Sequence, residues 1–94
     1  MKAAVVVANE DVQYLEIPEP EVKPGYVKIK VHYSGICGSD IPRVLHNGVH
    51  FYPIVLGHEF SGDVVEIGEG VTKVKAGDRV SGAPLVPCMK CEDC

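Results

Sequence analysis

The eight residues YVKIKVHY, from Tyr26 to Tyr33, carry the clearest structural pattern in this chain of 94 residues. Apolar side chains alternate along them with lysine and histidine, which places Val27, Ile29, Val31 and Tyr33 on one side. Successive side chains of a strand point to opposite faces of a sheet, so this alternation predicts a half-buried β-strand.

On both sides of this segment, the sequence predicts further short strands separated by turns. A turn at Asn9-Glu10-Asp11 and an extended loop around Pro24-Gly25 are typical strand boundaries, because glycine and proline favour turns. Short strands at regular spacing indicate an all-β barrel or sandwich. The other predicted strands are Lys2 to Ala8, Val12 to Ile17, Gly62 to Ile67 and Arg79 to Ala83.

One short helical turn interrupts this pattern. Ser39-Asp40 can cap a turn that runs through Pro42 to Leu45, and Asn47-Gly48 is expected to end it. Elsewhere Gly68-Glu69-Gly70 begins like a dinucleotide-binding motif. Lys73 stands where its third glycine is needed, so a hairpin turn is predicted there instead.

Charge and hydropathy exclude two classes of function. The formal net charge is −4 and no run of Lys or Arg occurs, whereas a nucleic-acid-binding surface requires a basic face. The apolar run near the amino end, from Ala3 to Ala8, is too short for a signal-peptide core or a membrane span. We therefore expect a cytoplasmic protein with no nucleic-acid or membrane partner.

Three of the four cysteines, Cys88, Cys91 and Cys94, are spaced two residues apart at the end of the sequence. Such spacing lets successive thiolates point at one metal ion, and cysteines of a cytosolic protein are poor disulfide candidates. Zinc is the favoured ion. An iron–sulfur cluster is the alternative, since ferredoxins share the C-x2-C-x2-C run but continue it with x3-C-P.

Two more segments hold metal-ligand residue types beside glycines. Cys37 lies in SGICGSD and His58-Glu59 in LGHEFSG. Their combination with the terminal cysteines is open in two ways. Cys37 could complete a single closed site of four thiolates, or Cys37 and His58 could form a separate, open site, which is the kind that catalysis requires.

The segments SGICGSD (34–40), YPIVLGHEFSGDVVEIGEGV (52–71), GDRVSGAP (77–84) and PCMKCEDC (87–94) resemble those of the zinc-dependent medium-chain alcohol and polyol dehydrogenases. The resemblance extends over essentially the whole chain. It implies a mainly β fold, a GroES-like, partly open β-barrel, of which residues 1–94 form the amino-terminal part of the catalytic domain. It also implies a separate NAD-binding Rossmann domain that this chain does not contain.

The same resemblance implies roles for individual residues. Cys37 and His58 match ligands of a catalytic zinc, and Glu59 matches the acidic residue beside or on that metal. Ser39 matches the hydroxyl that relays the substrate proton. A histidine that many relatives place five residues after the cysteine is here Pro42. The ligands matched to a structural zinc are Cys88, Cys91 and Cys94.

The implied activity is the oxidation of a polyol or a polyol phosphate to a keto sugar, with galactitol 1-phosphate favoured and NAD as hydride acceptor. We expect a small-molecule substrate, a homo-oligomer, and no turnover by these 94 residues alone. Arg43 is a hypothetical contact for a substrate phosphate, because a guanidinium can bind phosphate with two hydrogen bonds. The alternative function is a small zinc-binding module with one all-cysteine site.

Overall fold

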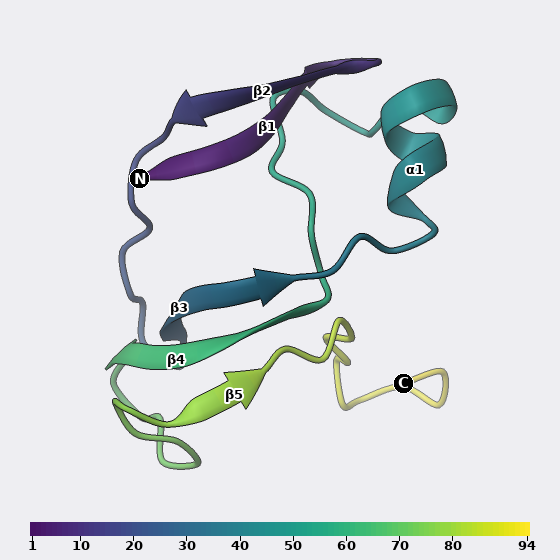
Figure 1. Ribbon diagram of the computed structural model, residues 1–94. Helices are drawn as coiled ribbons and strands as arrows, with labels where there is room; N and C mark the ends of the chain where they lie inside the picture. Colours follow the sequence, from purple (N-terminus) through teal and green to yellow (C-terminus); the bar gives the residue numbers. More distant parts are fainter.

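The computed structural model describes residues 1–94 and shows two antiparallel sheets (Figure 1). Strands β1 (Lys2–Ala8) and β2 (Asp11–Glu16) form a hairpin. Strands β3 (Val27–Ser34), β4 (Phe60–Ile67) and β5 (Arg79–Ser81) form the second sheet in that order. The mainly β class is confirmed, and strand boundaries differ from the predicted ones by two residues or fewer.

The β3–β4 pairing departs from the simple alternation that the sequence predicted. The register shifts between Lys28 and Ile29 and again between Val31 and Tyr33. Each shift adds an unpaired residue, which breaks the regular alternation of faces. The strand is half-buried only at its start. Val31 and Tyr33, predicted to lie on the buried side, are 52% and 78% exposed.

A short helical segment follows the loop after β3. Helix α1 (Asp40–Pro42) continues as the wider turn η1 (Arg43–Asn47), and Gly48, with φ of 70°, ends it as predicted. The predicted side-chain cap was wrong. Ser39 occupies the N-cap position but makes no capping hydrogen bond, because its hydroxyl donates to a cysteine sulfur instead.

The chain then crosses back to the hairpin before it enters β4 (Figure 1). Ile54 pairs with Val6 through two backbone hydrogen bonds of 2.8 and 3.0 Å, which joins this crossing segment to β1. The buried apolar side chains are those of Val5, Val6 and Val64. A cavity of about 970 Å³ separates β1 from β3. Neither helical segment is long and apolar enough to cross a membrane.

Candidate metal centres

The three terminal cysteines share one tight loop after β5. The Sγ atom of Cys94 lies 3.3 Å from those of Cys88 and Cys91, which are themselves 3.4 Å apart. Met89 between them has a positive φ of 59°, so the backbone curls within the C-x2-C step. The Cys88 backbone N–H also donates to the Cys94 sulfur at 3.2 Å. The structure thus brings together the three thiols that the spacing predicted.

Hydrogen bonding prepares one of these thiols for metal binding. The backbone N–H of Lys90 is the main cause that lowers the pKa of Cys88 from 9.0 to about 7, and the Cys94 and Cys91 thiols add to it. Metals bind the thiolate, so a lowered pKa reduces the proton competition near neutral pH.

The trio also fits zinc by size. Four sulfurs held at about 2.3 Å around a tetrahedral zinc lie roughly 3.8 Å apart. The observed separations of 3.3–3.4 Å need only a small expansion to reach that value. The group supplies three of the four ligands that a closed zinc site takes.

A second group joins Cys37, from the loop after β3, to His58 and Glu59, from the segment that leads into β4. Their ligand atoms all lie within 4.8 Å of one another. A backbone hydrogen bond of 2.6 Å from the Gly35 N–H to the Glu59 carbonyl holds the two segments together. Sulfur, imidazole nitrogen and carboxylate oxygen are all zinc ligands, and three of them leave a tetrahedral position open.

Gly57 positions the imidazole of this second group. Its φ is 128°, a conformation that side-chain-bearing residues rarely adopt, and an added Cβ would lie 3.1 Å from the Ser34 hydroxyl. A glycine is therefore required directly before His58.

Ser39 lies beside the second group, as the family resemblance implies. Its hydroxyl donates to the Cys37 sulfur at 3.3 Å and is exposed. An O–H donor on a thiolate ligand stabilises its negative charge. Because this hydroxyl contacts a candidate metal ligand, a molecule bound at the open coordination position of the metal would lie near it.

Asp40 is the residue of this region that the sequence analysis missed as a site residue. Its side chain is 9% exposed, and its Oδ2 accepts the Cys37 backbone N–H at 3.1 Å. Its Oδ1 has no hydrogen-bond partner and lies 3.8 Å from His58 Nδ1 and 3.9 Å from the Arg43 guanidinium. In the sequence, the only indication that Asp40 belongs to the site was its position three residues after Cys37.

The two groups are separate, which distinguishes between the two combinations left open by the sequence. Cys37 groups with His58 and Glu59, and the terminal cysteines form a trio without it. A single site of four thiolates is not the arrangement found. A buried carboxylate oxygen without a partner beside His58 also fits a centre that gains positive charge when a cation binds.

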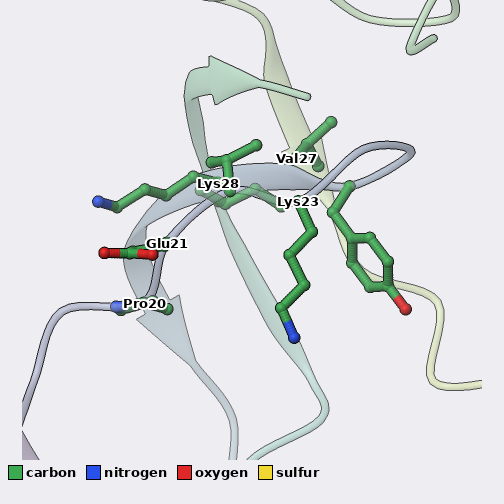
Figure 2. A pocket seen from close by; sticks show the side chains of 8 residues that line it. Pro20, Glu21, Lys23, Val27 and Lys28 are labelled. Carbon is green, nitrogen blue, oxygen red and sulfur yellow. The ribbon is translucent and has the colours of Figure 1, made fainter. Parts of the chain in front are cut away.

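A further pocket, shown in Figure 2, lies away from both groups. It is formed by residues 20–23 and the start of β3 and has a volume of about 330 Å³. Its Lys28 is already paired with Glu19 at 2.7 Å. No cysteine or histidine lines it, so it offers no comparable metal chemistry.

The sheet topology, the crossing segment and the open Cys–His–Glu group define the class of GroES-like dehydrogenase domains. The chain belongs to this family: the alcohol dehydrogenase GroES-like domain matches residues 23–94. The GroES-like fold expected from the sequence is thereby confirmed.

Galactitol 1-phosphate 5-dehydrogenase of Escherichia coli K12 is 45% identical over 95 residues, with 100% of this chain and 28% of that protein covered. The crystal structure of the Escherichia coli galactitol-1-phosphate dehydrogenase superimposes with a TM-score of 0.87 over 100% of this chain and 28% of its own. The chain is also similar to other dehydrogenases. L-threonine 3-dehydrogenase of Streptomyces avermitilis is 48% identical over 99 residues, covering 100% of this chain and 29% of that protein.

A structure described as a short chain alcohol dehydrogenase of Escherichia coli CFT073, in complex with NADH, is 38% identical. Its TM-score is 0.88, and the match covers 100% of this chain and 27% of that chain. The chain therefore spans less than a third of the length of the relatives it matches.

Proposed function

We propose that this chain is the amino-terminal part of the catalytic domain of a zinc-dependent dehydrogenase that oxidises a polyol or polyol phosphate with NAD. Galactitol 1-phosphate is the favoured substrate. The open group of Cys37, His58 and Glu59 carries the proposal, because a mixed three-ligand set suits a catalytic metal rather than a closed structural one. Identity of 45% to a galactitol 1-phosphate 5-dehydrogenase supports the substrate.

Two zinc ions are assigned to the two groups. Cys37, His58 and Glu59 would hold the catalytic ion, and Cys88, Cys91 and Cys94 would hold the structural one. When bound, the catalytic zinc supplies Lewis-acid chemistry that lowers the pKa of an alcohol hydroxyl. Asp40, 3.8 Å from His58 Nδ1, restrains the imidazole and offsets the positive charge.

Ser39 is assigned the first step of proton removal. Its exposed hydroxyl lies 3.3 Å from the Cys37 sulfur and can accept the proton of a substrate hydroxyl while passing its own to solvent. Pro42 has no side chain that can carry a proton, so the relay ends at water. Glu59 supplies a carboxylate in the same group, which offsets the positive charge of a bound metal ion.

The rest of the enzyme is proposed from the family. The hydride is accepted by NAD bound to a Rossmann domain, and one relative solved with NADH supports that cofactor. We further propose a cytoplasmic homo-oligomer, with a small-molecule substrate as its partner.

A substrate panel tests the proposed function. The full-length protein, loaded with zinc, is assayed for NADH formation on galactitol, sorbitol, L-threonine and galactitol 1-phosphate. We expect the highest kcat/KM on galactitol 1-phosphate, and a loss of at least about 100-fold in Cys37→Ser, which removes a ligand of the catalytic ion. No NADH formation on any polyol or polyol phosphate would reject the proposal.

A further inference from the structure

A cavity of about 540 Å³ lies between η1 and the segment 48–56. This volume falls in the range of roughly 300–1,000 Å³ that small-molecule sites occupy. Three of its lining side chains, those of Arg43, Asn47 and His50, can donate hydrogen bonds, and no Asp or Glu lines it. Its lining thus carries one guanidinium and no carboxylate, in a chain with 13 acidic residues and a net charge of −4.

The donors of this cavity are not used within the chain. The side chains of Arg43, Asn47 and His50 take part in none of its hydrogen bonds. The only carboxylate near the guanidinium is that of Asp40, at 3.9 Å, which is longer than a hydrogen bond. An anion in the cavity would therefore gain hydrogen bonds without breaking any that these three side chains make within the chain.

The cavity adjoins the Cys37–His58–Glu59 group. A single carboxylate oxygen, Asp40 Oδ1, lies 3.9 Å from the Arg43 guanidinium and 3.8 Å from His58 Nδ1. Leu56, two residues before His58, also lines the cavity. Asp40 is thus a common neighbour of the candidate metal centre and of the Arg43 guanidinium that lines the cavity.

We propose that this cavity binds the phosphate group of a phosphorylated polyol, with the Arg43 guanidinium as its cationic group and the His50 and Asn47 side chains as further hydrogen-bond donors. The inference rests on the proposed function, which places the reacting hydroxyl at the Cys37–His58–Glu59 group. A phosphate monoester carries a charge of about −1.5 to −2 near neutral pH and three acceptor oxygens. Three separate donors match it better than they match a planar carboxylate, which has two oxygens.

Kinetics on paired substrates test the inference in the full-length, zinc-loaded protein. Arg43→Ala is expected to lower kcat/KM for galactitol 1-phosphate on the order of 10–100-fold, mainly through KM, and to leave galactitol nearly unaffected. His50→Ala, on a separate segment, is expected to act in the same direction. Arg79→Ala removes the chain's other arginine, which lies on β5 outside the cavity, and should leave the ratio of the two substrates unchanged.

Binding of inorganic phosphate, followed by calorimetry, separates this inference from the proposed function. We expect the wild type to bind phosphate, and to bind acetate far more weakly. Arg43→Ala and His50→Ala should each weaken phosphate binding at least about 10-fold. This result would support the subsite even in a protein that oxidises no polyol. Equal kinetic losses on phosphorylated and unphosphorylated substrates, or phosphate binding that neither variant changes, would overturn it even in an active polyol dehydrogenase.

Discussion

The backbone conformation of Gly57 links the local chain geometry to the candidate metal centre. Its φ of 128° favours glycine, and the next residue, His58, faces Cys37 and Glu59. The position of the imidazole therefore depends on a backbone state that most residues cannot adopt without strain.

Gly57→Ala is predicted to destabilise the domain by about 1–3 kcal/mol, because the new side chain would hold the backbone in a sparsely populated region. Urea unfolding of the wild type and the variant measures this loss. Gly38→Ala is the matched control, since an added Cβ there meets nothing within 4 Å. Equal midpoints for the two variants would contradict the assigned role of Gly57.

The lowered pKa of Cys88 predicts a pH-dependent reactivity. In metal-free protein, alkylation of Cys88 by iodoacetamide should rise to half its maximal rate near pH 7 and fall below that pH, because only the thiolate reacts. Mass spectrometry of the labelled peptide gives the rate at each pH. Cys91→Ala removes one hydrogen-bonding thiol and should move the midpoint upward. A wild-type midpoint near the ordinary value of 9.0 would contradict the geometry of the trio.

The three-stranded sheet contains an ionic cluster at its bulged end. His32 Nε2 lies 2.9 Å from Asp63 Oδ2, and Arg79 Nε lies 3.3 Å from the other oxygen. The cluster thereby joins β3, β4 and β5. The hydrogen bond with His32 is the main cause that lowers the pKa of Asp63, and the contact with Arg79 acts in the same direction.

The sign of this shift fixes its effect on stability. A carboxyl with a lowered pKa in the folded state stabilises that state above its ordinary pKa of 3.8, and the contribution is lost as the pH falls through the folded-state value. Asp63→Asn should therefore lower the Tm by a few degrees at about pH 6, and the difference should shrink toward about pH 3. A difference that grows in acid would contradict this assignment.

Part of the secondary structure could be predicted from the sequence. Lys2–Ala8 was predicted with its observed ends, because an apolar run followed by a turn determines a strand locally. The bulge near His32 could not be predicted, since it depends on pairing with β4, about thirty residues away. The hydroxyl of Ser39 was predicted to cap the helix, but in three dimensions a sulfur competes for it.

The candidate site was predicted residue by residue but not as a geometry. Cys37, His58 and the terminal cysteines are evident from residue type and spacing. Their division into two groups depends on the Gly35–Glu59 contact, which joins segments far apart in sequence. Asp40 was missed because its burial, rather than its sequence neighbours, gives it a role.

The molecule as a whole is more open than a compact domain of its mass. Its accessible surface is 7504 Å², whereas about 5,300 Å² is expected for a compact monomer of this mass. The radius of gyration is 15.2 Å, against about 12 Å for a compact chain of this length. Large apolar side chains such as Tyr33, Ile36 and Leu85 remain exposed.

We predict that the 94-residue chain expressed alone associates with itself, because exposed apolar surface and unpaired strand edges favour pairing with a second copy. Sedimentation velocity should show dimers or larger species at micromolar concentrations. Val31→Lys, on the edge strand β3, should weaken the association, and Val86→Lys, outside the strands, should not. A strictly monomeric wild type would contradict the prediction.

The existence of two separate metal centres can be measured by counting zinc in the full-length protein. We expect two zinc ions per chain in the wild type and one in each of the variants Cys37→Ser and Cys91→Ser. In Cys37→Ser the terminal cysteines should keep their ion and remain protected from alkylation. One zinc ion per wild-type chain, lost together with that protection in Cys37→Ser, would show instead that Cys37 and the terminal cysteines share a single centre.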